Sequence, residues 1–204
     1  MRSILYLSCS PRGAAAHSSV MATELMARLR QRAPAAVVTT RDLAANRPPI
    51  VDAAFSAAIL GVPGGAPPAL AESEVLIAEL EACDALVIAT PMHNYCVPAV
   101  LKAWIDQIVR IHRTFASTPT GKVGKLPDRP VYVVVASGGW FTGPAPTGTP
   151  PQPDFLTPYL RAILATIGLR TVHFITLEGV TRGPEALSRA VATARADLDE
   201  LLPV

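Results

Sequence analysis

Three segments of this 204-residue chain carry the residue types that bind a phosphate-bearing planar ligand. Residues 8–19 are rich in serine, residues 91–98 combine amide, imidazole and aromatic side chains, and residues 137–141 hold two adjacent glycines beside two aromatic residues. Hydroxyl and backbone N–H groups at a helix start suit an anion, whereas glycines allow the backbone to approach a flat ring closely. The three segments therefore predict one small-molecule site.

The serine-rich segment offers the hydroxyl groups of Ser10 and Ser18 close to a predicted helix start. Free N–H groups and the positive end of the helix dipole, roughly half a charge, would favour a phosphate there. The segment contains neither Gly-x-Gly-x-x-Gly nor Gly-Lys-Ser/Thr, so dinucleotide and nucleoside triphosphate sites are disfavoured and a monophosphate fits better. A helix capped by Ser18 or Ser19, with no ligand, explains this segment equally well by itself.

The other two segments follow strands whose continuous apolar sequence predicts burial on both faces. Met92, His93, Asn94 and Tyr95 come directly after such a strand, where polar groups are costly unless they line a pocket. Gly138 and Gly139 likewise come shortly after the predicted strand 130–136.

Apolar periodicity defines the elements that must position these segments. The pattern predicts strands at 3–7, 36–41, 84–90, 130–136 and 171–176, and helices at 18–32, 72–82, 97–111, 155–167 and 184–201. The proline-rich stretch 143–153 reads as a long surface loop. Strands that alternate with helices predict a three-layer, doubly wound α/β fold with a five-stranded parallel sheet, which binds ligands beyond the carboxyl ends of its strands.

Composition narrows the class of protein. The chain is long enough for a single domain over residues 1–204, and half of its residues are hydrophobic. A net charge of +2 without long charge runs argues against nucleic-acid and membrane partners. Three cysteines form neither a disulfide framework nor a metal motif, so we expect no metal and a cytoplasmic location. We also expect neither export nor a membrane span, because the sequence shows no leader pattern and no apolar run of about 18 residues.

Several motifs in order along the chain resemble one family. They are Ser10-Pro11-Arg12-Gly13 with Ser18, Arg41-Asp42-Leu43-Ala44-Ala45-Asn46, Pro91-Met92-His93-Asn94-Tyr95, Val97-Pro98 through Ile105-Asp106, Gly138-Gly139, and Thr157-Pro158-Tyr159-Leu160. This pattern resembles the FMN-dependent NADH-azoreductases, also called NADH:quinone oxidoreductases. The resemblance implies a flavodoxin-like sheet of order 2-1-3-4-5, bound FMN, NADH or NADPH as donor, quinone or azo acceptors, and a homodimer with helix 97–111 as a candidate contact.

The resemblance also assigns site residues and exposes three departures. It implies that the FMN phosphate is held by Ser10, Ala16, His17 and Ser18, the ring by Pro91, Met92, His93, Asn94 and Tyr95, and the pyrimidine edge by Ala136, Ser137, Gly138 and Gly139. Ala16 stands where the family has serine, His93 where tyrosine is usual, and Ser137 where arginine is common. The departures bear on flavin affinity, flavin potential and acceptor preference.

The resemblance implies a ping-pong cycle in which the flavin itself carries the electrons, so no catalytic side chain is expected. Two alternatives remain: a specialised reductase of a biosynthetic pathway, in which His93 and residues 143–153 reshape the pocket, and a non-catalytic flavin or electron-transfer module. Cys96 is expected to be inert, because it has neither a basic neighbour nor a partner thiol. Trp104 is expected in the core or a dimer interface, whereas Trp140 and Phe141 suit either a roof over the acceptor or packing of the proline-rich loop.

Overall fold

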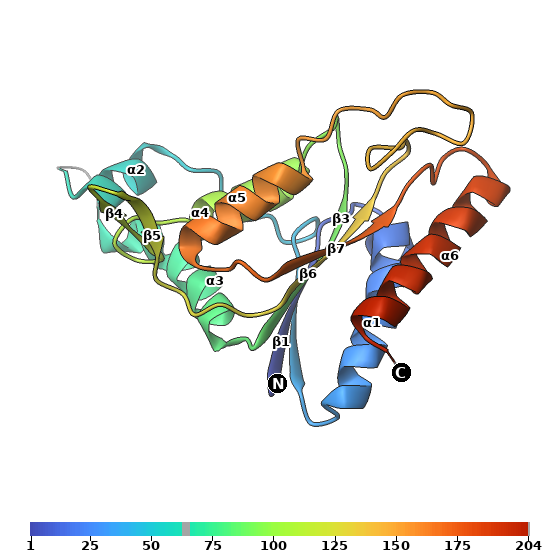
Figure 1. Cartoon of the computed structure of the whole chain (residues 1–204). Helices are drawn as coiled ribbons and strands as arrows, with labels where there is room; N and C mark the ends of the chain where they lie inside the picture. Colours follow the sequence, from blue (N-terminus) through green and yellow to red (C-terminus); the bar gives the residue numbers. More distant parts are fainter. Residues whose placement is uncertain (63–65, 204) are drawn as a thin grey trace.

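The computed structural model describes residues 1–62 and 66–203, and its centre is a parallel five-stranded sheet (Figure 1). The strands are β1 (Ser3–Ser8), β2 (Val37–Asp42), β3 (Ala85–Pro91), β6 (Val131–Ala136) and β7 (Val172–Leu177), in the order β2-β1-β3-β6-β7. Every adjacent pair in this sheet is parallel. The order confirms the predicted 2-1-3-4-5 arrangement, with β6 and β7 as its fourth and fifth strands.

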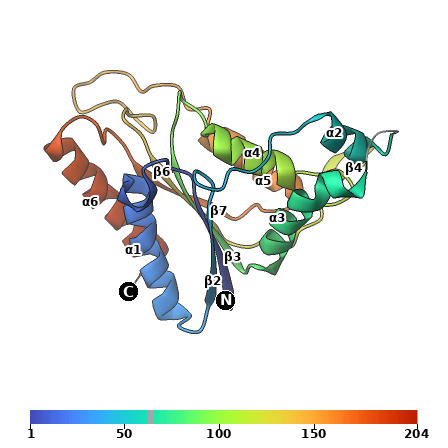
Figure 2. The same ribbon diagram turned by 180° about the vertical axis from the view of Figure 1, so that it is seen from behind.

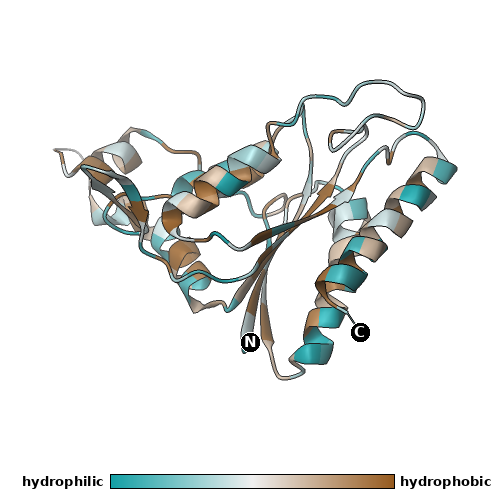
Figure 3. Cartoon of the chain, in the orientation of Figure 1, coloured by the Kyte–Doolittle hydropathy of each residue, from teal (hydrophilic) through white to brown (hydrophobic). Residues whose placement is uncertain are grey.

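Helices cover both faces of the sheet and complete the three layers (Figures 1 and 2). One face packs against α1 (His17–Arg32) and α6 (Pro184–Leu201), and the other against α3 (Ala71–Ala82), α4 (Ala99–Ile108) and α5 (Thr157–Ile167). Strands β3 and β6 are buried almost throughout, which explains their unbroken apolar sequence. Colouring by hydropathy shows apolar strands at the centre and polar residues on the outer side of α6 (Figure 3).

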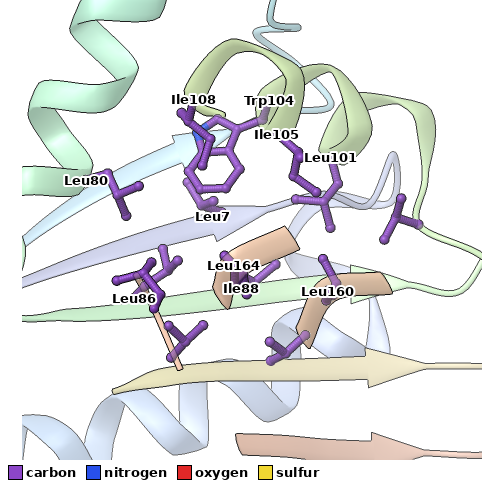
Figure 4. Packing of buried hydrophobic residues seen from close by; sticks show 14 of the residues in the cluster. Leu7, Leu80, Leu86, Ile88, Leu101, Trp104, Ile105, Ile108, Leu160 and Leu164 are labelled. Atoms are coloured by element: carbon purple, nitrogen blue, oxygen red, sulfur yellow. The ribbon is translucent and has the colours of Figure 1, made fainter. Parts of the chain in front are cut away.

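The larger core cluster lies between the sheet and helices α3, α4 and α5 (Figure 4). Trp104 of α4 is fully buried there and lies above Leu7 of β1, while Leu160 and Leu164 approach from α5. Burying side chains of this size contributes roughly 1.5–3 kcal/mol each, so this cluster is a main source of stability. The burial of Trp104 confirms its expected place in the core.

One helix and one hairpin were not predicted from the sequence. Helix α2 (Ala53–Leu60) begins at Asp52, whose carboxylate accepts the Phe55 N–H at 2.8 Å, and ends at Gly61 in the left-handed conformation. Strands β4 (Phe115–Thr118) and β5 (Gly121–Gly124) form a separate antiparallel hairpin. Short 3-10 turns, η1 (Gly13–Ala15) and η2 (Pro67–Leu70), precede α1 and α3.

Helix α4 is shorter than the predicted 97–111. It starts after Pro98, which is its N-cap in an extended conformation, and the proline ring disfavours helix at the preceding residue, Val97. It stops at Ile108 because the Thr114 hydroxyl donates to the Ile108 carbonyl at 2.6 Å and accepts the Arg110 N–H at 2.9 Å. Helix α5 likewise begins at Thr157 instead of Phe155, since the Asp154 carboxylate accepts the N–H groups of Leu156 and Thr157, each at 2.9 Å.

Residues 143–153 contain no helix or strand, as predicted, and arch from the end of β6 towards α6 before the chain returns to α5 (Figure 1). Within the described ranges 1–62 and 66–203, no helix is both long enough and apolar enough to cross a membrane.

Candidate functional site

The carboxyl ends of β1, β3 and β6 bring the three predicted segments to one edge of the sheet. The Cys9 N–H donates to Ala89 O, and the Met92 N–H donates to Ala136 O, both at 2.9 Å. The loop after β1 is thereby tied to β3, and the loop after β3 is tied to β6. Segments that are more than 40 residues apart in sequence thus form adjacent walls at the predicted switch point.

The start of α1 has the properties of an anion site. Its N-cap residue is Ala16, whose side chain makes no capping hydrogen bond, so the first N–H groups of this 16-residue helix have no side-chain acceptor. Ser18 and Ser19 lie in the first turn and are 1% and 3% exposed. Neither hydroxyl has a hydrogen-bond partner among the described residues. The expectation that Ser18 or Ser19 caps the helix was wrong, because the helix begins two residues earlier than that role requires.

The two serines have different surroundings. The Ser19 hydroxyl lies close to the Tyr6 hydroxyl, although the geometry does not make a hydrogen bond. Burial raises the pKa of Tyr6, and the neighbouring Ser19 and Ser8 side chains oppose that rise. The Ser18 hydroxyl is buried and has no partner among the described residues, and such a hydroxyl is costly unless a ligand satisfies it.

Cationic groups and Ser10 complete this corner. Ser10 is 4% exposed, and its Oγ accepts the Arg12 N–H at 3.2 Å. Burial lowers the pKa of His17, and the nearby Arg12 guanidinium lowers it further, so the imidazole sits in a locally positive environment. Burial raises the pKa of the Cys9 thiol far above its ordinary value, which excludes Cys9 as a nucleophile.

The loop after β3 is a tight turn held in an unusual conformation. The backbone groups of His93 and Cys96 exchange two hydrogen bonds of 2.9 Å, and the central residues Asn94 and Tyr95 have positive φ angles of 48° and 68°. Asparagine tolerates this region, but for tyrosine it costs on the order of 1–3 kcal/mol. The Tyr95 carbonyl accepts the Phe155 N–H at 2.9 Å, which anchors the turn to the segment before α5. Strain kept in place by neighbouring contacts is typical of ligand sites.

The loop after β6 brings the backbone close to its neighbours. Ser137 is 3% exposed, and its Oγ accepts the Gly139 N–H at 3.2 Å. A Cβ built on Gly138 would lie 2.9 Å from Thr181 Oγ1, and one on Gly139 would lie 2.2 Å from Gln152 Oε1. A side chain at either position would therefore have to displace the side chain of Thr181 or Gln152.

His93 lines an apolar cavity of about 420 Å³ between this edge of the sheet and α4. The cavity is also lined by Pro11 of the serine-rich segment, Arg47 and Ile50 of the loop after β2, and Val100 of α4. The position at which this chain departs from the usual tyrosine thus faces a space of small-ligand size.

The remaining candidates take structural positions. Phe141 is 7% exposed and belongs to the larger core cluster, whereas Trp140 contacts Gly179 and lines a cavity with Pro146 of the proline-rich loop. Cys96 is partly exposed, and its Sγ lies 3.7 Å from Phe155 O. The sequence interpretation missed Gln152, which reaches Ser137 and Met92. Its only sequence signal was a single amide side chain within a proline-rich stretch.

Comparison with known proteins matches almost the whole chain. The family model for the flavodoxin-like fold matches residues 2–202. FMN-dependent NADH:quinone oxidoreductase 4 of Pseudomonas fluorescens is 47% identical over 198 residues, which cover 97% of this chain and 94% of that protein. The chain belongs to this family.

Other relatives support the same assignment. FMN-dependent NADH:quinone oxidoreductase 5 of Burkholderia lata is 47% identical over 187 residues, covering 92% of this chain and 90% of that protein. Among solved structures, the fold matches an azoreductase from Bacillus anthracis with a TM-score of 0.81 at 24% identity, covering 98% of this chain and 96% of the other. An FMN-dependent NADH-azoreductase from Bacillus anthracis, solved in complex with FMN, matches with a TM-score of 0.80 at 21% identity, covering 99% and 100%. The family's flavodoxin-like fold is therefore present over the full length of the described chain.

Proposed function

We propose that this chain is an FMN-dependent NADH oxidoreductase that reduces quinones and cleaves aromatic azo compounds. The observation that carries the proposal is the buried Ser18 hydroxyl without a partner at the uncapped start of α1, on the same sheet edge as the strained Asn94–Tyr95 turn and the Gly138–Gly139 loop. The names of relatives that are 47% identical over nearly the whole chain support the cofactor and the quinone acceptor.

The first corner fits a phosphate monoester. Ser10 and Ser18 supply hydroxyl groups, the first N–H groups of α1 have no side-chain cap, Arg12 makes the local potential positive, and His17, whose lowered pKa favours the neutral ring, can donate a ring N–H. A phosphate would satisfy Ser18 and interact favourably with the helix dipole. Ala16 contributes no hydroxyl, so the remaining groups must hold the phosphate alone. The family's phosphate role is proposed here for Ser10, Ala16, His17 and Ser18 as a backbone and side-chain unit.

The other two loops fit a planar ring. The residues from Pro91 to Tyr95 would contact its face and central edge, while those from Ala136 to Gly139 would meet its pyrimidine edge. Among the described residues, the N–H groups of Asn94 and Tyr95 donate no backbone hydrogen bond, so both are free for a ligand. Gly138 and Gly139 let the backbone approach without a Cβ in the way.

FMN, when bound, supplies the redox chemistry by accepting a hydride from NADH and passing two electrons to the acceptor. The protein's part is positioning. The Asn94 region offers N–H donors, and the Gly138–Gly139 loop directs backbone dipoles to the edge where negative charge develops. His93 and the adjacent apolar cavity give the acceptor or the donor a partly desolvated place beside the loop. The proposed reaction does not require a dedicated catalytic acid or base from the protein.

We extend the proposal to assembly and location. The chain is expected to act as one cytoplasmic domain and to form a homodimer. Its support is the exposed apolar side chain of Ile50, which lines the apolar cavity and is 85% exposed. Light scattering at several concentrations tests the dimer, and a monomer throughout would refute it.

The test of function uses the absorbance spectrum of the purified protein after it is loaded with FMN and gel-filtered. We expect flavin bands to remain with the protein, to bleach with NADH and to return on addition of a benzoquinone. Flavin that stays bound but does not bleach would support the non-catalytic module. Bleaching without reoxidation by simple quinones or azo dyes would support a specialised reductase. Loss of flavin on the column would refute the proposal.

A further inference from the structure

Gln152 joins the two loops that form the ring site. Its Nε2 donates to Ser137 Oγ at 2.9 Å and lies 3.2 Å from Met92 Sδ. Its backbone N–H donates to Trp140 O at 2.8 Å. One residue of the proline-rich segment thus contacts the loop after β3 and the loop after β6 at the same time.

The sequence around Gln152 makes this bridge rigid. Pro151 and Pro153 flank it, so φ is fixed on both sides and Gln152 itself is restricted to an extended backbone. A stiff segment loses less conformational entropy when it orders a side chain, and the backbone bond to Trp140 adds a fixed anchor. The Gln152 side chain is only partly buried, which leaves part of its amide able to face a ligand at this edge.

Gln152 also contacts the position at which the family resemblance implies an arginine that this chain lacks. Ser137 stands at the position at which the family commonly has arginine, and the Gln152 amide contacts Ser137 Oγ directly. Gly139 is adjacent, and its missing Cβ makes room for Gln152 Oε1. The amide therefore lies within the loop that would meet the pyrimidine edge of a flavin.

We propose that Gln152 is a positioning residue of the flavin site, which sets the spacing of the Met92 and Ser137 loops and presents a neutral amide beside Ser137. This inference rests on the proposed function. It predicts that the charge at position 152 tunes the potential of the bound flavin, because a reduced flavin carries negative charge at its pyrimidine edge.

The experiment measures FMN dissociation constants by fluorescence quenching and midpoint potentials by equilibration with reference dyes. We expect Gln152→Ala and the near-isosteric Gln152→Leu to weaken FMN binding roughly 5- to 10-fold. Both variants lose the hydrogen bond from Gln152 Nε2 to Ser137 Oγ that holds the two loops at their spacing. We expect Gln152→Lys to raise the midpoint potential and Gln152→Glu to lower it. The melting temperature of each variant without flavin shows whether it folds.

Matched controls are Thr149→Lys and Thr149→Glu, which place the same charges on an exposed residue of the same segment. We expect their potentials to match that of the unaltered protein. Wild-type affinity in Gln152→Ala, or equal potentials in the Lys and Glu variants at position 152, would overturn the inference. Tighter FMN binding in Gln152→Ala would also overturn it, since the side chain would then block the ring. If the unaltered protein retains no FMN, the proposed function fails before this question arises.

Discussion

Replacing Ser18 by alanine should change the apoprotein and the flavin complex in opposite directions. Without flavin, the Ser18 hydroxyl is 1% exposed and unpaired, so its removal relieves a desolvation cost of about 1–3 kcal/mol, offset in part by lost packing. We expect the apoprotein to become more stable or to stay unchanged, with a rise in melting temperature of about 2–4 °C per kcal/mol gained.

In the complex, the same hydroxyl should donate to a charged phosphate. A hydrogen bond to a charged group contributes about 1.5–3 kcal/mol, so Ser18→Ala should raise the FMN dissociation constant roughly 10- to 150-fold. The loss should be smaller for riboflavin, which has no phosphate. Fluorescence quenching gives both constants, and intrinsic fluorescence from Trp104 and Trp140 follows unfolding of the flavin-free protein.

Ser19→Ala is the matched control, because Ser19 is equally buried and unpaired on the same helical turn but lies beside Tyr6. We expect its FMN affinity to remain within about twofold of the original, well below the effect of losing a charged hydrogen bond. Equal losses in the two variants, or an unchanged FMN constant in Ser18→Ala, would refute the assignment of Ser18 to the phosphate.

Three further predictions concern other parts of the chain. Ala16→Ser adds an N-cap side chain and a hydroxyl donor for a phosphate, so it should raise apoprotein stability by about 1 kcal/mol and tighten FMN binding. If neither the melting temperature rises nor the FMN dissociation constant falls, the start of α1 is not the phosphate site. Burial opposes ionisation of Asp128, but hydrogen bonds from Thr171 and from backbone N–H groups, including that of Arg170 at 2.8 Å, outweigh it and lower the pKa of Asp128 to about 2. The ionised carboxylate therefore stabilises the fold above about pH 4, and this contribution is lost as the pH falls towards 2. Asp128→Asn should lower the melting temperature at pH 7 by about 1–3 °C, a modest amount because the site is exposed. This difference in melting temperature should vanish near pH 2. A difference that stays constant with pH would show that the ionised Asp128 carboxylate does not stabilise the fold. Finally, a thiol reagent should label Cys96 in the native protein and spare Cys9, and Cys96→Ser should abolish the labelling while leaving turnover intact; lost turnover would show that Cys96 is not inert.

Local sequence was sufficient for the parts of the fold whose apolar pattern is regular. Strands β3 and β6 are buried on both faces and therefore appear as unbroken apolar runs, and the stripe of α6 repeats along its length. It was insufficient where an element is short or lacks periodicity. Helix α2 has eight mostly small apolar residues, and the β4–β5 hairpin is marked chiefly by Gly121, whose φ is 125°. Neither carries a pattern that separates it from a loop.

The sequence by itself determined the parallel sheet, the edge at which the site lies and the loops that form it, because alternating strands and helices place all carboxyl ends of the strands at one edge, while the strand order came from the family resemblance. Tertiary structure alone decided what each side chain does there. The hydroxyls of Ser18 and Ser19 are both buried and unpaired, yet only the packing of α1 places Ser19 beside Tyr6. Gln152 reaches Ser137 and Met92, which are 15 and 60 residues away. Such contacts depend on how the chain returns across the sheet, and periodicity, which records local burial, carries no information about that path.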